Sequence, residues 1–310
     1  MTRINQTVSN EADCWQLAGN LNRVQCAEWG VGRRPSRAVA FDTTAWEGRP
    51  TLQSLSEAKG DRVSSSVSVH LLPLLFDREA LSGGVAVVID VLRASTTIIQ
   101  AFAAGAEMVI PCDEVETAQG IARLLPPDKV LLGGERHGAR IPGFDLDNSP
   151  LKYVPETVAG KTLAFTTTNG TRALTRCQLA DRVLIGAFVN RQAIVDALVQ
   201  DGRPVHLVCA GTDGLITSED VLFGGAVAQA VRERRQDRSI PDDETQLALA
   251  LWQTAKNDAD QIRQILRDSR GGRNLLELGF DHDIDRAAQC DLFKLVPEYD
   301  ADQSLIRVFP

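Results

Sequence analysis

The stretch Val85–Thr97, VAVVIDVLRASTT, decides the expected fold of this chain. Its first five residues are apolar and mostly β-branched, which is typical of a strand buried on both faces. Asp90 follows where that strand should end. Beyond it, apolar side chains recur at helical spacing, and Ser95 and Thr96 are available as N-terminal caps. The stretch therefore predicts a strand, a polar turn and a helix in direct succession.

The same alternation continues along the chain. Strand-like apolar runs and helical segments follow one another from Val67 to Cys209, which is typical of an α/β protein. The segment 242–290 is mainly helical in pattern, and short strands are expected at Phe293–Val296 and Leu305–Phe309. We expect a three-layer α/β/α domain with a largely parallel sheet, which can include antiparallel strands, and a helical C-terminal region.

Composition limits the class of protein. The chain has 310 residues, of which 44% are hydrophobic and 24% charged, as in a globular protein with a sizeable core. A net charge of −8 argues against a broad nucleic-acid-binding face. No apolar run is long enough to span a membrane, and the six cysteines form no C-x-x-C pair. These features predict a cytoplasmic protein with reduced cysteines that acts on small molecules, with a homo-oligomer left open.

Residues 1–65 differ from the rest of the chain, because they show no sustained period of either 2 or 3.6 residues. We predict that they form a poorly ordered N-terminal extension, with a start site assigned too far upstream as the alternative. The functional domain then covers residues 66–310.

Asp90 and Arg93 lie between the expected strand and the expected helix. Ligands of open α/β sheets bind at this position, beyond the carboxyl ends of the strands. A structural alternative is that Asp90 merely caps the helix and Arg93 pairs with it. We favour a functional pair.

Four further polar loops are candidates for the same site. Three directly follow apolar strands and the fourth separates two helical segments; they are Gly133–Pro150, Thr166–Arg172, Cys209–Asp220 and Ser269–Asn274. If the strands are parallel, the first three loops converge with Asp90 at one edge of the sheet. Carboxylates together with arginines and backbone donors suit Mg²⁺ and a phosphate ester. We therefore expect a magnesium-assisted site for a small anionic phosphorylated substrate.

Several of these segments carry a family resemblance. The matching segments are Val88–Thr97, Leu132–Arg136, Gly143–Leu146 with Asn148–Pro150, Thr166–Arg172, Gly186–Asn190, Cys209–Thr212, Glu219–Asp220 and the region from Asn274 onward. In this order, from about residue 67 to the C-terminus, the sequence resembles the 2-phosphosulfolactate phosphatase family. The resemblance implies Mg²⁺-dependent hydrolysis of 2-phospho-3-sulfolactate to 3-sulfolactate and phosphate, a step toward coenzyme M.

Roles in such a reaction are assigned as predictions. The expected metal ligands are Asp90, Glu135 and Asp220. The expected catalytic residues are Asp90, Arg93, Asp145 and Arg172, with the arginines stabilising the phosphoryl oxygens and Asp145 holding a water. The expected substrate-binding residues are Arg136, Asn148, Ser149, Thr168, Asn169, Gly170 and Arg273.

Three alternatives stay open from the sequence. Asp90 could attack phosphorus itself and form an aspartyl-phosphate, although we favour attack by a metal-bound water. The enzyme could hydrolyse another small phosphorylated hydroxy acid. The same loops could also belong to a non-catalytic protein that binds an anionic metabolite.

Overall fold

A single mixed sheet organises the computed structural model of the chain, which describes residues 66–256 and 258–309. The strands of this sheet lie in the order β1-β8-β2-β7-β9-β10-β3-β6-β4-β5. Their bounds are β1 Val67–His70, β2 Val85–Ile89, β3 Met108–Cys112, β4 Val130–Arg136, β5 Ala139–Arg140, β6 Thr162–Thr166, β7 Arg182–Gly186, β8 Val205–Cys209, β9 Pro297–Asp300 and β10 Leu305–Val308. The expected α/β fold is confirmed, with a sheet that is mixed rather than purely parallel.

Two parallel blocks make up most of the sheet. The first block is β1-β8-β2-β7 and the second is β3-β6-β4. The hairpin β9–β10 lies between them and pairs antiparallel with β7 on one side and with β3 on the other. Because three successive pairings are antiparallel, the second block runs opposite to the first along the sheet.

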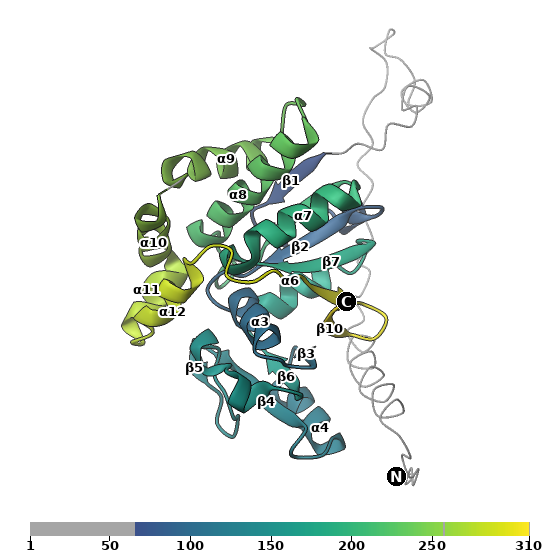
Figure 1. Ribbon diagram of the computed structural model, residues 1–310, viewed down its shortest axis with the longest axis vertical. Helices are drawn as coiled ribbons and strands as arrows, with labels where there is room; N and C mark the ends of the chain where they lie inside the picture. The colour runs from purple at the N-terminus through teal and green to yellow at the C-terminus, as the bar shows by residue number, and fades with distance from the viewer. Residues whose placement is uncertain (1–65, 257, 310) are drawn as a thin grey trace, which may run out of the picture.

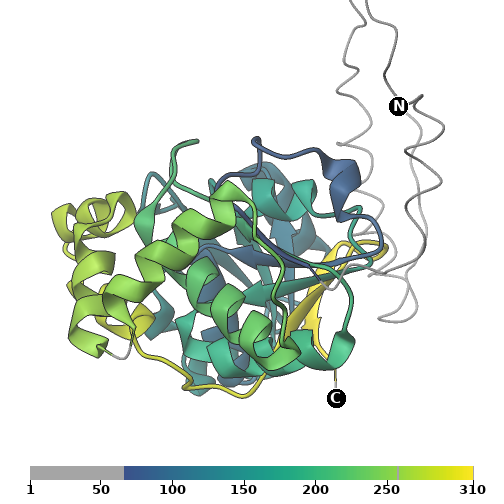
Figure 2. The same cartoon turned by 90° about the horizontal axis from the view of Figure 1, so that it is seen from above.

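Helices cover both faces of the sheet. Their bounds are α3 Ala94–Ala103, α4 Val115–Leu124, α5 Pro155–Val158, α6 Gly170–Arg176, α7 Arg191–Asp201, α8 Ser218–Arg235, α9 Asp243–Ala255, α10 Ala259–Asp268, α11 Arg270–Glu277 and α12 Asp281–Ala287, with short 3-10 turns η1 Arg78–Leu81, η2 Pro150–Lys152 and η3 Phe188–Asn190. Figure 1 shows α3 and α6 between the two blocks, and the helices α10 to α12 gathered at one end, as Figure 2 also shows from above. The expected helical C-terminal region is confirmed.

Alternation along the strands explains these layers. In β2, Val87 and Ile89 face a core shared with α7, α8 and α9, whereas Ala86 and Val88 face α3 and α6. The core around α3 and α6 continues from the first block, through Tyr299 of β9, into the second block. A third core packs α4 against the opposite face of the second block. Successive residues of a strand point to opposite faces, so a fully apolar run needs helices on both.

The sheet must twist strongly for loops of the two oppositely directed blocks to meet at one site. Adjacent strands rotate by roughly 20–25° relative to one another, and six such steps separate β2 from β4. The accumulated rotation turns the carboxyl ends of the second block back toward those of the first. The loops that follow β2, β4, β6 and β8 therefore meet in space although the two blocks run in opposite directions.

The strand predicted at Phe293–Val296 is wrong, because the strand of this region begins at Pro297. The backbone N–H of Phe293 donates instead to the carbonyl oxygen of Val189, 2.9 Å away in η3. That hydrogen bond ties the segment to the connection that precedes α7 rather than to a strand. The second expected strand is confirmed as β10. The predicted extension, residues 1–65, lies outside the described residues.

None of the helices in the described ranges is long and apolar enough to span a membrane. Cys112, Cys177 and Cys209 are buried free thiols, and Cys290 is a partly buried one. Burial of three of these side chains is in keeping with a structural role, and the reduced state of the cysteines stays a prediction.

Two histidines form a buried pair at the edge of the first block. His70 and His206 are each 8% exposed, and their Nε2 and Nδ1 atoms lie 3.1 Å apart. Burial, assisted by the charge of His206, lowers the pKa of His70 from 6.5 to about 4. Burial also lowers the pKa of His206. Both side chains are therefore neutral in the folded protein at neutral pH.

This pair should make stability depend on pH. Between about pH 6.5 and 4 the unfolded chain binds protons that the folded chain excludes, so the free energy of unfolding should fall as pH falls. His70 alone should contribute about 3 kcal/mol of this loss. Urea unfolding of the wild type and His70→Gln across this range measures the effect, with His282→Gln as control because His282 is 88% exposed. Equal pH slopes for the wild type and His70→Gln would contradict the prediction.

Candidate active site

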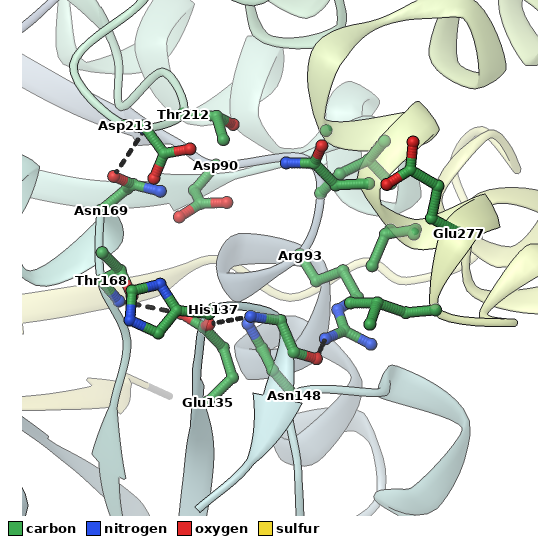
Figure 3. A pocket seen from close by; sticks show the side chains of 16 residues that line it. Asp90, Arg93, Glu135, His137, Asn148, Thr168, Asn169, Thr212, Asp213 and Glu277 are labelled. Carbon is green, nitrogen blue, oxygen red and sulfur yellow. Dashed lines mark hydrogen bonds between the residues drawn. The ribbon is translucent and has the colours of Figure 1, made fainter.

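A cavity of about 260 Å³ lies where the loops after β2, β4, β6 and β8 meet, and α11 forms its opposite wall. Its lining includes Asp90, Asn169 and Thr212 from the loops after β2, β6 and β8, and Glu135 from the end of β4. Figure 3 shows their side chains around a shared space. The expected convergence of loops from distant parts of the sequence is thus present, on a scale that suits a small metabolite.

Asp90 occupies the turn between β2 and α3. Its Oδ1 accepts a hydrogen bond from the N–H of Ala94 at 3.2 Å. Its backbone N–H donates to the Ser95 hydroxyl oxygen at 3.0 Å, and Thr96 Oγ1 donates to the carbonyl oxygen of Val91 at 2.8 Å. Ser95 and Thr96 are therefore not N-terminal caps: their hydroxyls lock the turn, and Asp90 accepts the first free N–H of the helix. Asp90 Oδ2 accepts no hydrogen bond from the described residues.

Electrostatics around Asp90 disfavour its charge. Burial raises the pKa of its carboxyl group, and the neighbouring carboxylates of Asp220 and Glu135 raise it further, against the opposing effects of the Ala94 N–H and Arg93. Only 8% of Asp90 is exposed. A carboxylate in this setting is stabilised in its ionised form by a nearby cation.

Glu135 joins two loops of the cavity wall. Its Oε1 accepts a hydrogen bond from the N–H of Thr168 at 2.9 Å, and its Oε2 accepts one from the N–H of Gly138 at 2.7 Å. Both oxygens therefore already hold backbone groups. Its main role in this structure is to fix the β4–β5 turn against the loop that follows β6.

Arg93 continues this chain of hydrogen bonds. Its Nη2 donates to the carbonyl oxygen of Gly138 at 2.8 Å, and its Nη1 donates to Asp283 Oδ2 at 2.7 Å. The hydroxyl of Ser149 donates to the other oxygen of Asp283 at 2.6 Å. The guanidinium also stacks on the ring of Phe280, 4.4 Å from the centroid. Arg93 thus pairs with Asp283 of α12 and not with Asp90. Of the structural alternative, Asp90 does cap the helix, but the expected pair between Asp90 and Arg93 is not formed.

Six of the predicted residues line the cavity, namely Asp90, Arg93, Glu135, Asn148, Thr168 and Asn169. Two of them carry buried oxygen atoms with no hydrogen-bond partner among the described residues, Asn148 Oδ1 and Thr168 Oγ1. Asn169 is held by its Oδ1, which accepts the N–H of Asp213 at 3.3 Å. Unpartnered buried polar atoms are costly, so this wall is suited to a polar ligand.

Arg136 and Asp145 are not brought to the cavity. Arg136 follows Glu135 in β4, and its side chain therefore points to the opposite face, where Nη2 donates to the carbonyl oxygen of Asp113 and to Thr166 Oγ1. Asp145 is exposed, and its Oδ2 accepts the N–H of Leu132 at 2.8 Å. The structure gives no support to substrate binding by Arg136 or to water binding by Asp145.

Four more predicted residues lie outside the cavity lining. Ser149 is buried against Asp283, and Gly170 packs beside Asp90, so both support the wall from behind. Arg172 is exposed on α6. Arg273 is exposed on the far side of α11 and donates to the carbonyl oxygen of Asp268. Neither arginine is placed to contact a ligand of this cavity.

Asp220 is a structural carboxylate in this structure. Its Oδ1 accepts the N–H of Val91 at 2.9 Å, and its Oδ2 accepts the N–H of Gly211 at 3.0 Å. It is 2% exposed and does not line the cavity. Burial, followed by the charge of Glu219, raises its pKa. Asp220 therefore ties the ends of β2 and β8 to the start of α8.

The expected three-carboxylate metal site does not form. Among residues 66–256 and 258–309, no group of three or more His, Cys, Asp or Glu side chains is arranged to hold a metal ion. Magnesium, however, needs only one or two carboxylates, with waters and phosphate oxygens as the other ligands. Asp90 Oδ2 and Thr168 Oγ1 are oxygen atoms without hydrogen-bond partners among the described residues, and both residues line the cavity, so the donor set fits Mg²⁺.

The sequence did not single out Asp283 or Glu277. Asp283 stands in the first turn of α12, where an acidic residue is favoured by the helix dipole whatever its function. Glu277 lines the cavity from the end of α11. The one sequence signal for either residue was that it lies in the region from Asn274 onward, which carries part of the family resemblance. That signal marked the region but did not identify these two side chains.

Comparison with known proteins bears on this site. A model of the family described as 2-phosphosulpholactate phosphatase matches residues 71–302. Proteins named probable 2-phosphosulfolactate phosphatase are similar to the chain: one from Symbiobacterium thermophilum is 39% identical over 74% of this chain and 96% of its own length. One from Prochlorococcus marinus (strain MIT 9313) is 42% identical over 68% and 87%. One from Caldanaerobacter subterraneus subsp. tengcongensis is 39% identical over 68% and 86%.

The matched region contains every residue that lines the cavity, together with Asp283 and Ser149. The site and the similarity thus occupy the same part of the molecule, and the chain belongs to the 2-phosphosulpholactate phosphatase family.

Proposed function

We propose that this protein hydrolyses 2-phospho-3-sulfolactate to 3-sulfolactate and phosphate with the help of Mg²⁺, the type of reaction used on the way to coenzyme M. The family name supplies the substrate. The observation that carries the proposal is the free Oδ2 of Asp90, which lies on a cavity wall that has unpartnered oxygen atoms beside it. The prediction of a cytoplasmic protein stays a prediction.

The reaction requires one bond to form and one to break at phosphorus. The oxygen of a water bonds to phosphorus, the bond from phosphorus to the oxygen on carbon 2 breaks, and that oxygen gains a proton as the hydroxyl of 3-sulfolactate. Mg²⁺, when bound, neutralises the phosphoryl oxygens and makes a water more acidic. Asp90 Oδ2 and the Thr168 hydroxyl would hold the ion, and the Asn169 amide would orient the phosphoryl group.

Asp90 can act in two ways, as a metal ligand or as the attacking nucleophile. We favour the first, because Asp90 stands among other carboxylates that would repel a phosphoryl group without an intervening cation. Rapid acid quenching with labelled substrate distinguishes the two. Labelled phosphate trapped on the wild-type protein, and absent from Asp90→Asn, would overturn our preference.

Metal removal should abolish phosphate release. Purified protein treated with a chelator should show no release above background, and added Mg²⁺ should restore it. The carboxylates of Asp90 and Glu135 line the site, and the guanidinium of Arg93, which also lines it, is already paired with Asp283. Ca²⁺ should restore less, since it prefers more ligands at longer distances. Full activity after chelation would refute the magnesium proposal and leave the hydrolytic one intact.

A panel of 2-phospho acids tests the substrate. The highest kcat/KM should belong to 2-phospho-3-sulfolactate. A higher value for a phosphorylated hydroxy acid without a sulfonate would favour the alternative phosphatase. Binding without turnover of any member, in the presence of Mg²⁺, would favour a non-catalytic metabolite-binding protein.

A further inference from the structure

The Arg93 guanidinium is fixed on three sides. Asp283 pairs with it from α12 at 2.7 Å, the Gly138 carbonyl holds it from the β4–β5 turn at 2.8 Å, and the ring of Phe280 stacks on it at 4.4 Å. The side chains of Arg93 and Asp283 are each 2% exposed. A guanidinium confined in this way has one orientation, so its remaining N–H groups point in a fixed direction.

That direction leads away from Asp90. Both residues belong to the turn between β2 and α3, yet Figure 3 shows the Arg93 side chain running toward Asn148 while Asp90 faces Asn169 and Asp213. Two of the five guanidinium N–H groups are occupied, by Asp283 and Gly138, and Arg93 still lines the cavity. The cavity therefore has two polar ends, one at Asp90 and one at Arg93.

Asn148 adds a second group to the Arg93 end. It is 3% exposed, its backbone carbonyl accepts the Thr97 hydroxyl at 2.9 Å, and its side-chain Oδ1 has no partner. Because amide oxygen and nitrogen are exchangeable by a half turn of the side chain, this buried amide can offer a donor to an anion. A planar guanidinium beside an amide donor is suited to a three-oxygen or two-oxygen anion.

We propose that Arg93 and Asn148 bind the second oxyanion of the substrate, its sulfonate or carboxylate, and that Asp283 is the positioning residue that turns Arg93 toward it. The substrate class is then a phosphate monoester with another oxyanion a few bonds from the phosphate. The inference rests on the proposed function only for the phosphate at the Asp90 end. It assigns to Arg93 a role different from the phosphoryl contact expected from the sequence.

The binding experiment uses the product, which has no phosphate. Titration calorimetry with 3-sulfolactate should give a Kd that rises about tenfold or more in Asp283→Asn, because a charge-assisted contact is misaligned. Arg93→Met should weaken binding further, and Asp283→Asn should add nothing in the Arg93→Met background. Asp281→Asn is the matched control, since Asp281 lies in the same helix and pairs with Arg267 near the surface.

The kinetic experiment compares two substrates. Asp283→Asn should raise KM for 2-phospho-3-sulfolactate by a clearly larger factor than KM for isopropyl phosphate, which has no second oxyanion. An equal decrease of kcat for both substrates would overturn the proposal and indicate that Arg93 contacts the phosphoryl group instead. If Asp283→Asn fails to fold, Ser149→Ala, which removes only the hydroxyl that holds Asp283, should show the same KM effect at smaller size.

These outcomes separate the inference from the proposed function. Arg93-dependent binding of 3-sulfolactate by a protein that releases no phosphate would refute the phosphatase proposal and support the inference. Phosphate release by a protein whose binding of 3-sulfolactate does not depend on Arg93 would support the phosphatase proposal and refute the inference.

Discussion

Asp90→Asn should lower kcat for phosphate release by about a thousandfold or more while the protein keeps its fold. Asparagine has the same shape and retains an oxygen for the Ala94 N–H, but it loses the charge that we assign to the metal or to attack. Burial raises the pKa of Asp90, so its ionised form costs stability. The free energy of unfolding of the variant should therefore equal or exceed that of the wild type, which steady-state kinetics and urea unfolding measure together.

Asp145→Asn is the control for this change. Asp145 is exposed and accepts the N–H of Leu132 outside the cavity lining, a contact that asparagine also makes. Its kcat should stay within a few fold of the wild type. Loss of activity in Asp145→Asn, or wild-type activity in Asp90→Asn, would show that the chemistry is not centred on Asp90.

Gly134→Ala should destabilise the fold by about 3 to 5 kcal/mol. Gly134 has a φ of +131°, and a Cβ at this position would lie 1.9 Å from the carbonyl oxygen of Thr166 on the neighbouring strand. The clash is with the backbone of Thr166, which pairs with Gly134 in the parallel pair β4–β6, so the two strands must separate. Because Glu135 follows Gly134 in β4 and Thr168 lies two residues beyond β6, the variant should also lose activity.

Gly143→Ala is the matched control. Gly143 also has a positive φ, +82°, but no atom lies within 4 Å of its added Cβ. Its cost should be only that of the left-handed conformation, about 1 to 2 kcal/mol. Urea unfolding of both variants separates the cost of the backbone conformation from the cost of the clash with the neighbouring strand. Equal destabilisation would mean that conformation, and not the close approach of the strands, limits residue 134.

The part of the fold that follows from the sequence is the part set by short-range pattern. The run Val85–Ile89 and the helical spacing after Ala94 predicted β2 and α3 with nearly the correct limits. The place of β9–β10 between the two blocks could not be predicted, because four-residue strands carry no information about their partners. The resulting change of strand direction also escaped prediction.

The site shows the same division. The sequence identified the loops that meet, and six predicted residues line the cavity, but it did not give the direction of each side chain. Arg136 illustrates the reason. The Gly-Gly pair before Glu135 was interpreted as the start of a loop, whereas β4 continues to Arg136, and strand alternation then sends Glu135 and Arg136 to opposite faces. Asp283 was missed because its partner lies 190 residues away in the sequence.

The hairpin β9–β10 has a consequence for the order in which the molecule is assembled. Asp90 and Thr212 lie in loops of the first block, whereas Glu135, in β4, and Thr168, in the loop after β6, belong to the second. Within the described sheet, the two blocks are joined only through residues 297–308, which a ribosome makes after the strands of both blocks. A growing chain can therefore begin to fold each block early, yet it completes the pocket only after the hairpin β9–β10 has been made.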